Sequence, residues 1–219
     1  MSQIPVELLN IVASFLLSKE LHTCSCVCRY WFSIFRVAIQ RAKVFIKTSE
    51  QLHSFVLRHD PQLFPPGQLI RELRLRRTFN LQPGDLEQIQ RHYPMVEVFE
   101  VGQDYGTIGH PDYYRLFQWW PHLRRTPQIS KYSDDLVHYL HHSGRNIVDF
   151  KIGYHAATVL VGGGKLSQVL PLFACLKQLG ISGPFNGFSF TPRIMDELHQ
   201  VVPWLKCVRL HGVDMVSTW

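Results

Sequence analysis

Two short segments of the sequence gather side chains that commonly bind metal ions. Cysteines occur at every second position from 24 to 28, and His138 lies at helical ligand spacing from His141 and from His142. Zinc sites usually use paired Cys-x-x-Cys or Cys/His spacings, and alternate cysteines on a helix cannot all face one ion. The histidines lack an obvious carboxylate or third ligand nearby. The cysteines are better interpreted as small buried helix residues, so the sequence predicts neither a metal site nor a cofactor.

The segment Gly162-Gly163-Gly164-Lys165 comes nearest to a phosphate-binding loop. A P-loop requires Gly-x-x-x-x-Gly-Lys-Ser/Thr between a strand and a helix. Here Leu166 follows the lysine, and no glycine occupies the required earlier position. A flexible loop is therefore favoured. An enzyme or nucleotide-binding protein that uses this loop is the weakest alternative, and we expect the protein not to be an enzyme.

A third segment, Arg71–Arg77, carries arginines that could pair with anionic groups. The formal net charge of +6 also favours acidic partners. Leu73 and Leu75 interrupt the cluster, so it differs from the basic tails that commonly bind nucleic acid. We expect no nucleic-acid partner. Binding of an acidic or phosphorylated protein segment and an ordinary solvated surface are equal alternatives for these arginines.

The composition of the chain limits the classes of protein to which it can belong. Hydrophobic residues make up 46% of the 219 residues, which is enough for a packed core. The five cysteines are unevenly spaced, and Met1–Pro5 lacks the basic start of a signal peptide. The apolar stretch Leu8–Leu17 is too short to span a bilayer. We expect a reducing environment in the cytoplasm and/or nucleus, and no membrane partner.

The first forty or so residues have the pattern of three short helices. Pro5 suits the first turn of a helix, and Glu7 places negative charge near the positive end of that helix. Only two polar residues interrupt the apolar run from Leu8 to Leu17, so this helix is apolar on more than one face. One face can pack inside a small module, whereas the other must be covered by a second domain or a second protein.

A second helix is predicted to begin at Ser18, a favoured N-cap residue. The apolar residues that follow recur in steps of three and four, which predicts that they lie on one side of a helix; they are Cys24, Val27, Cys28, Trp31, Ile34 and Phe35. About forty residues cannot bury this much apolar surface by themselves, because small domains are rich in surface. The three helices therefore need a partner.

These amino-terminal residues resemble the F-box family. The matching residues are Ile4-Pro5-Val6-Glu7-Leu8-Leu9-Asn10-Ile11-Val12, then Leu16 and Leu21, and finally Val27-Cys28-Arg29-Tyr30-Trp31. The family pattern is Leu-Pro-x-Glu-(hydrophobic)-Leu-x-x-Ile, a middle leucine and a Val-Cys-(basic)-x-Trp ending, so Ile4 replaces the usual leucine. The resemblance implies binding to the Skp adaptor and, through it, to the cullin and RING subunits of a ubiquitin ligase.

The same resemblance implies which residues lie in or directly behind the adaptor interface. They are Ile4, Pro5, Leu8, Leu9, Val12, Val27 and Trp31. The alternative is a helical hairpin that packs on the rest of its own chain.

The remainder of the chain repeats the apolar pattern (apolar)-x-x-(apolar)-x-(apolar). Complete copies begin at residues 70, 96, 147, 176 and 205, and a degenerate copy begins at Leu123, where Thr126 and Gln128 break the rule. Successive copies begin 26, 27, 24, 29 and 29 positions apart. The pattern and spacing resemble leucine-rich repeats, which are about 20–29 residues long. An ordinary α/β domain with evenly spaced strands is the alternative.

Helix signals lie between these copies, at 85–90, 133–140 and 191–201, and Pro94, Pro121 and Pro203 each stand just ahead of a copy. We therefore expect short parallel strands in one curved sheet, with one crossover helix between neighbours. In each copy the first, fourth and sixth residues should be buried, and the intervening residues should face the concave side. The copy at Leu123 should be the poorest strand, and the copy at Leu205 should be an edge.

Together these patterns predict an α/β protein with an N-terminal three-helix F-box at 1–40, a linker at 41–68 and a leucine-rich-repeat solenoid at 69–219. About six units are expected, one of them degenerate, and the array is expected to be incomplete at its C-terminus. The predicted function is substrate recognition in a Skp–cullin–F-box ubiquitin ligase; the alternative is a repeat scaffold without a ubiquitin-ligase role. The candidate residues for binding an unidentified substrate protein are Arg74, Arg76, Arg77, Lys151, Tyr154 and Arg209.

Overall fold

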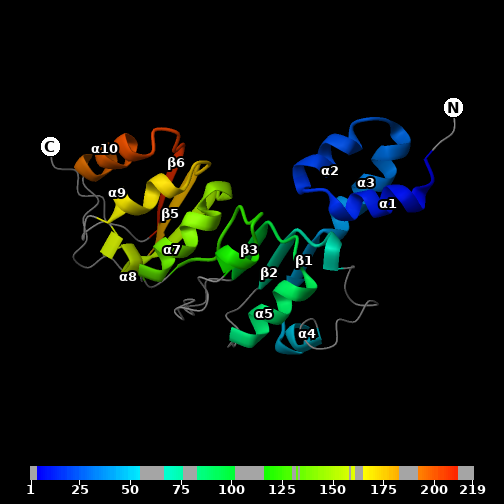
Figure 1. Cartoon of the computed structure of the whole chain (residues 1–219), viewed down its shortest axis with the longest axis horizontal. Helices are drawn as coiled ribbons and strands as arrows, with labels where there is room; N and C mark the ends of the chain where they lie inside the picture. The colour runs from blue at the N-terminus through cyan, green and yellow to red at the C-terminus, as the bar shows by residue number, and fades with distance from the viewer. Residues whose placement is uncertain are drawn as a thin grey trace.

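The computed structural model describes residues 4–54, 67–75, 83–101, 116–129, 132, 134–157, 159–160, 165–182 and 192–211. It is a mixed α/β structure with a bundle of three helices at one end and a row of parallel strands beyond it (Figure 1). The amino terminus lies at the helical end, and α10 lies at the other (Figure 1). Among the described helices none is long and apolar enough to cross a membrane.

The helical bundle consists of α1 (Val6–Phe15), α2 (Ser18–Ser25) and α3 (Arg29–Arg41). Its core is small and is made by Leu9, Ala13, Leu21, Ile34, Phe35 and Ala38. The helix after Pro5 begins where the sequence predicts, because proline lacks the N–H that a first turn leaves unpaired.

Two details of the bundle differ from the sequence predictions. The N-cap of α2 is Leu17 and not Ser18, and the side chain of Glu20 accepts the Leu17 N–H at 2.8 Å. The apolar stripe from Cys24 to Phe35 does not lie on one helix, because α2 ends at Ser25 and Cys28 is the N-cap of α3. A helix break inside a periodic pattern is invisible to spacing alone, since the period continues on the far side.

Six strands pair in parallel, in the order β1-β2-β3 and β4-β5-β6. Their bounds are β1 Lys43–Ile46, β2 Glu72–Leu75, β3 Val98–Val101, β4 Asp149–Gly153, β5 Gln178–Ser182 and β6 Cys207–His211. Arg125 joins the two groups, because it forms parallel bridges with Val98 on one side and Asp149 on the other. The predicted parallel pairing of the copies is confirmed.

One hydrogen-bond motif runs through the whole row. The carbonyl of Ala42, just before β1, accepts the N–H groups of Arg71 and Glu72 at 2.8 and 2.9 Å. The same doubly accepting carbonyl recurs in each later unit, at Arg71, Glu97, Arg124, Val148 and Lys177. Consecutive units are therefore joined in the same way from β1 to β6, through the interval around Arg125 that contains no regular strand.

The first strand was not anticipated. The interval 41–68 was expected to be a linker, whereas it contains β1 and the short helix α4 (Ser49–His53). Val44 and Ile46 pair in register with Leu73 and Leu75 and are buried like them. In that register Arg41 is the residue equivalent to Ile70. The search pattern requires an apolar residue at this first position, so it did not find the copy that contains β1.

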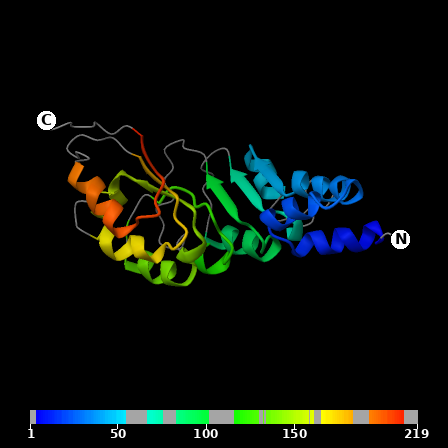
Figure 2. The ribbon, with the colours of Figure 1, turned by 90° about the horizontal axis from the view of Figure 1, so that it is seen from above.

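Helices follow the strands. They are α5 (Pro83–His92), α6 (Leu116–Trp119), α7 (Asp134–Ser143), α8 (Tyr154–Ala157), α9 (Leu166–Val169) and α10 (Pro192–Val201), with 3-10 turns at Gly67–Leu69, Gly144–Asn146 and Leu170–Leu172. Seen from above, α5, α7, α9 and α10 lie along one side of the strand row (Figure 2). The core lies between the two layers and includes the pairs Phe99–Trp120 and Phe150–Phe173, with ring centroids 5.2 and 4.7 Å apart.

The predicted burial of the first, fourth and sixth residues holds best in the middle of the row. The copies that begin at residues 70, 147 and 176 bury all three positions, whereas Val101 and the apolar residues of the copy at Leu205 are only partly buried. β6 stands at the end of its described group of strands, which accounts for the thinner cover over that copy.

The copy at Leu123 is the poorest strand, as predicted. It forms only isolated bridges, at Arg125 and Ile129. Arg125 faces Asp149 while Ile129 faces Ile152, so this segment has one residue more than its neighbour, as in a β-bulge. Because of this extra residue, Ile129 fills the buried position expected for Gln128. Thr126 is buried as well, and within the described ranges its hydroxyl oxygen has no hydrogen-bond partner.

Candidate functional site

Helix α1 has two apolar faces, and only one of them is covered. Leu9 and Ala13 are buried in the bundle core. On the other side Leu8, Val12 and Phe15 are 52%, 44% and 69% exposed. These residues recur at steps of four and three, so they form one continuous stripe along the helix. Large apolar side chains gathered on one face are the usual mark of an interaction surface.

The start of α3 extends this apolar surface. Val27, which precedes the helix, is 60% exposed, and Phe32 in its first turn is 46% exposed. The thiol of Cys28 accepts the Trp31 N–H at 3.5 Å and caps the helix. Trp31 is partly buried against Phe35, with ring centroids 5.5 Å apart. The cap and the ring contact fix where the exposed residues stand.

The structure places the sequence-predicted residues of the first module in two groups. Ile4, Pro5, Leu8, Val12 and Val27 are exposed, Leu9 is buried in the core and Trp31 is partly buried. Sequence reasoning missed Ile11, Phe15 and Phe32, which are exposed apolar residues of the same helices. The helical steps from Leu8 to Ile11 and Phe15 are a signal that could have found the first two.

A comparison with family models adds to this geometry. Residues 1–38 match the F-box-like family. The match spans α1 and α2 and ends within α3, so the F-box-like domain is the helical bundle that carries the exposed apolar stripe. A search of curated proteins finds no match for the chain.

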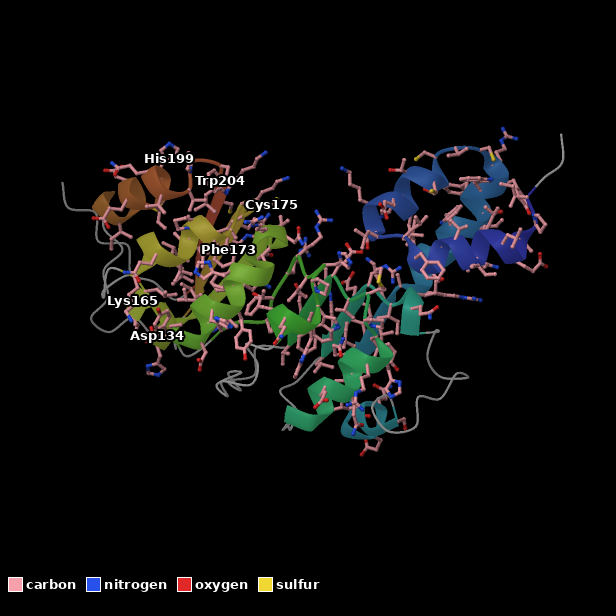
Figure 3. The ribbon with its side chains drawn as sticks, viewed as in Figure 1. Asp134, Lys165, Phe173, Cys175, His199 and Trp204 are labelled. Carbon is pink, nitrogen blue, oxygen red and sulfur yellow. The ribbon has the colours of Figure 1, made fainter. Side chains whose placement is uncertain are left out.

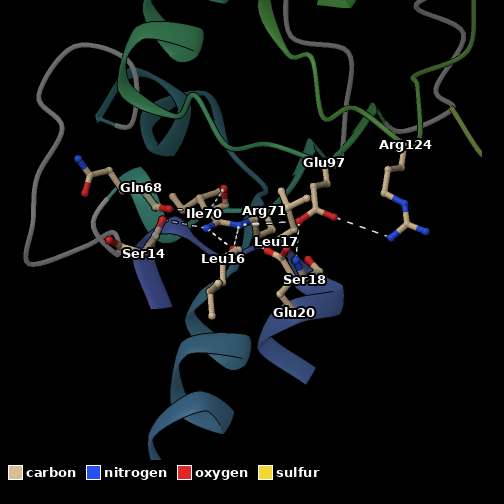
Figure 4. Close-up of polar contacts among 10 residues, drawn as sticks. All are labelled: Ser14, Leu16, Leu17, Ser18, Glu20, Gln68, Ile70, Arg71, Glu97 and Arg124. Carbon is tan, nitrogen blue, oxygen red and sulfur yellow. Dashed lines mark hydrogen bonds and ion pairs between the residues drawn. The ribbon is translucent and has the colours of Figure 1, made fainter. Parts of the chain in front are cut away.

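The F-box-like domain is joined to the strands through a buried arginine. Arg71, directly before β2, is 1% exposed. Its guanidinium donates to the carbonyls of Leu16 at 2.6 and 2.9 Å and of Ser14 at 3.0 Å, which close the end of α1 (Figure 4). It also donates to Gln68 and Ile70 in the strand half. One side chain therefore satisfies carbonyl groups on both sides of the junction.

A buried carboxylate completes the junction. Glu97, directly before β3, accepts the Ser18 N–H at 2.7 Å, and its Oε1 lies 3.8 Å from Nε of Arg71 (Figure 4). Burial lowers the pKa of Arg71, while the charges of Glu97 and Glu20 act in the opposite direction. Arginine stays protonated in proteins, so Glu97 balances a permanent buried charge. The pair fixes α2 against the first strands.

On the strand face two of the predicted substrate-binding residues, Arg74 and Lys151, pair with acidic residues of the chain. Arg74 forms ion pairs with Glu72 and, at 3.2 Å, with Glu100, and Nζ of Lys151 lies 3.5 Å from Glu100. The register brings these residues together, since Arg74 faces Glu100 across adjacent strands. This part of the face is a self-paired network of both signs rather than an open basic site.

The other predicted residues are less informative. Arg209 lies on β6 and is exposed. Tyr154 begins α8. Arg76 and Arg77 lie outside the described residues. The concave placement of all six candidates stays a prediction.

The cysteine, histidine and glycine segments singled out in the sequence form no metal-binding cluster in the described ranges. There, no group of three or more histidines, cysteines or acidic residues could hold a metal ion. Residues 162–164 of the glycine segment lie outside the described residues. Lys165 donates to Asp134 at 3.2 Å and lies 4.8 Å from the centre of the Tyr132 ring, in the arrangement of a surface ion pair (Figure 3).

Proposed function

We propose that this chain binds a Skp-type adaptor through the exposed apolar face of its F-box-like domain, as a non-catalytic subunit of a Skp–cullin–F-box ubiquitin ligase. The observation that carries the proposal is the stripe of Leu8, Val12 and Phe15 on a domain matched to the F-box-like family. Cullin and RING subunits would join through the adaptor. Such an assembly works in the cytoplasm and/or nucleus.

The energetics of the stripe favour a protein partner. Apolar surface contributes about 25 cal/mol per Å² when it is removed from water. A partner that covers α1 and the start of α3 would bury several half-exposed large side chains at once. The bundle core contains only six buried residues in the described chain. A bundle this small has no further side chains with which to cover its own exposed stripe.

We infer further that the row of strand–helix units is a leucine-rich-repeat solenoid that holds the substrate. The in-register parallel pairing within β1–β3 and within β4–β6, the recurring doubly accepting carbonyl and the steps of 24 to 29 residues support this inference. The chain would then raise the local concentration of a substrate lysine near the ubiquitin-conjugating enzyme, without forming or breaking a bond itself.

One observation favours a second candidate, a repeat scaffold without a ubiquitin-ligase role. The charges of Arg74, Glu100 and Lys151 are already paired within the strand face. A self-neutralised surface suits weak or several partners as well as one dedicated substrate. Adaptor binding distinguishes the two candidates, because the scaffold needs none.

The test is a direct binding measurement between a purified Skp-type adaptor and the full chain, wild type and Leu8→Asp/Val12→Asp. Both side chains are exposed, so the double variant should fold. In the complex it would place two carboxylates against an apolar surface, and affinity should fall about 100-fold or more.

The matched control is Val159→Asp/Met195→Asp, which adds the same charges to exposed apolar residues in the strand–helix half. This control should bind the adaptor like the wild type. Unchanged binding by the folded Leu8/Val12 variant would rule out the proposed interface, and a wild-type chain that binds no Skp-type adaptor would leave the scaffold function.

A further inference from the structure

The residues that directly precede the strands form one edge of the row, which we call the amino-terminal rim. At each rim position the backbone N–H donates to the carbonyl of the equivalent position one unit earlier. Neighbouring strands are about 4.8 Å apart, so the backbone holds the rim side chains at close and regular intervals. The positions joined in this way after Ala42 are Arg71, Glu97, Arg124, Val148, Lys177 and Lys206.

The charge of the rim is balanced near the F-box-like domain and unbalanced at the other end. Glu97 lies 3.8 Å from Arg71 and 3.9 Å from Arg124. Lys177 and Lys206 are both exposed. Among the described residues neither of these lysines has a carboxylate within ion-pair distance. Two like charges therefore occupy neighbouring rim positions, and the described chain supplies no counter-charge for them.

This pair of lysines is unfavourable for the isolated chain. Like charges side by side on adjacent strands repel each other. Cations commonly stabilise the carboxyl end of a helix, but this effect is confined to the last turn. Lys177 lies five positions after Leu172, where a 3-10 turn ends, and Lys206 lies five positions after Val201, where α10 ends. Both lysines are thus beyond the reach of a helix end, and their charge is available to an anionic partner.

An exposed tryptophan accompanies the two lysines. Trp204 precedes Lys206 by two positions and is 42% exposed. Its indole N–H donates to the carbonyl of Phe173 at 3.1 Å, so the part of the ring that faces water is apolar. Trp120 makes the same kind of bond to Tyr93 at 2.9 Å, but Trp120 is buried. Trp204 therefore joins two units as Trp120 does, and it also offers apolar surface to a partner.

We call Lys177, Trp204 and Lys206 the rim patch. It belongs to the units of β5 and β6, at the end of the row far from the F-box-like domain (Figure 1). Figure 3 shows Trp204 on the opposite side of the row from the ion pair of Lys165 and Asp134. The rim patch is thus separate both from the apolar stripe of α1 and from the paired charges of the strand face.

We propose that the rim patch binds an extended acidic segment of a partner protein. Lys177 and Lys206 donate charge-assisted hydrogen bonds to two neighbouring carboxylates of that segment, and an apolar residue beside them packs on Trp204. The carboxylates supply the counter-charge that the two lysines lack in the described chain. The proposal goes beyond adaptor binding and does not depend on it, since it uses other residues at the other end of the molecule.

The size of the rim patch favours a polypeptide over other polyanions. Proteins that hold nucleic acid commonly make about 6–10 phosphate contacts, and attachment to anionic lipid commonly uses clusters of about 4–8 basic residues. The rim patch has two lysines and one aromatic ring. A short acidic segment needs no more than two cations, and only a polypeptide places an apolar side chain next to its carboxylates.

The experiment uses the full chain and libraries of short peptides with degenerate flanks around a fixed central pair, Glu-Glu, Gln-Gln or Lys-Lys. Retention of Glu-Glu peptides with a large apolar residue beside the pair is expected. The best binder is then measured by fluorescence anisotropy with the wild type and Lys177→Gln/Lys206→Gln. Both lysines are exposed, so this rim variant should fold. It should lose affinity about tenfold or more, and the wild type should bind more weakly as salt is added.

The matched control is Lys19→Gln/Lys47→Gln, which removes two exposed lysines near the other end of the molecule. A second control, Arg209→Gln, removes an exposed cation of β6 itself. Both controls should bind the peptide like the wild type. Equal weakening by the two lysine double variants would show a general effect of charge, and a loss in Arg209→Gln as large as in the rim variant would place the site on the strand. Either result would overturn the proposal.

Other ligands provide further decisive outcomes. Lack of preference for Glu-Glu over Gln-Gln peptides would overturn the proposal. A single-stranded oligonucleotide and vesicles that contain phosphatidylserine are tested with the same proteins. Binding of either one through Lys177 and Lys206, without binding of any acidic peptide, would overturn the assignment to a polypeptide. Adaptor binding by the rim variant should equal that of the wild type, so failure of the rim proposal and failure of the adaptor proposal are distinguishable.

Discussion

The two halves of the chain differ in how many of their apolar side chains they bury. In the described residues the strand–helix half has a continuous core of 28 buried apolar side chains, whereas the F-box-like domain buries six. Thirteen large apolar side chains are exposed in that same part of the chain, and nine of them fall between residues 4 and 37. The strand–helix half is thus nearly closed, and the small domain keeps an apolar face for a partner.

This difference in burial leads to different expectations for the two halves as binding surfaces. A domain of about forty residues has too little interior to bury both faces of α1, so apolar surface should supply most of its binding energy to a partner. The strand half covers its apolar residues with helices and presents charges instead, including the two lysines of the rim patch. Its recognition should depend on charge and salt, and that of the F-box-like domain should depend on apolar contact.

The largest effect is expected where the halves meet. Arg71→Ala removes the buried cation beside the Glu97 carboxylate, which then keeps the Ser18 N–H and the half-exposed Arg124 at 3.9 Å. It also removes the donors to Ser14 and Leu16. Breaking a buried pair in this way costs about 3–5 kcal/mol. Chemical denaturation followed by circular dichroism measures this loss of unfolding free energy. Arg145→Ala, at an exposed arginine, should change it by about 0.5 kcal/mol or less. Similar losses for both would mean that Arg71 does not join the halves.

Substitutions on the two faces of α1 should have smaller effects on stability that differ clearly from each other. Leu9→Ala removes a side chain that is 2% exposed, and should lower the unfolding free energy by about 2–5 kcal/mol. Leu8→Ala, one position away on the exposed face, should cost about 1 kcal/mol or less and should instead weaken adaptor binding. Denaturation and adaptor affinity are measured on both variants. Equal costs in stability would contradict the division of α1 into a core face and a partner face.

The smallest effect is expected inside the strand half. The hydroxyl of Thr126 is buried, and the described part of the chain offers it no hydrogen-bond partner. Thr126→Val keeps the shape and removes the unpaired group, so stability should rise by about 1 kcal/mol. Thr126→Ala leaves space as well and serves as the comparison in the same thermal unfolding experiment. A loss of stability in Thr126→Val would show that the hydroxyl has a partner in solution.

Regular patterns in the sequence predicted most of the regular structure. The apolar pattern located five strands and their parallel pairing, and Pro5 located the start of α1. The pattern failed where one slot carried another residue type. Arg41 stands at the first position of the copy that contains β1, so the apolar pattern did not detect this strand. An extra residue near Gln128 shifts the buried position to Ile129.

Contacts between distant segments were not predictable from spacing. Arg71 was grouped with the surface arginines, yet it is buried against carbonyls 55 and 57 positions away. Arg74 was expected to be available to a substrate, but the strand register places Glu100 beside it. The contacts of Arg71 and of Arg74 depend on which segments lie side by side in the fold. The sequence of one copy does not show which segments these are.

Amide hydrogen exchange, measured with and without a purified Skp-type adaptor, is a direct test of the proposed adaptor interface. Small helices that bury little open readily, so a partner on α1 should slow exchange strongly there. We expect new protection within residues 4–38 and unchanged exchange across β5 and β6. Protection confined to residues 165–211, or no protection anywhere with adaptor in excess, would contradict the proposed interface.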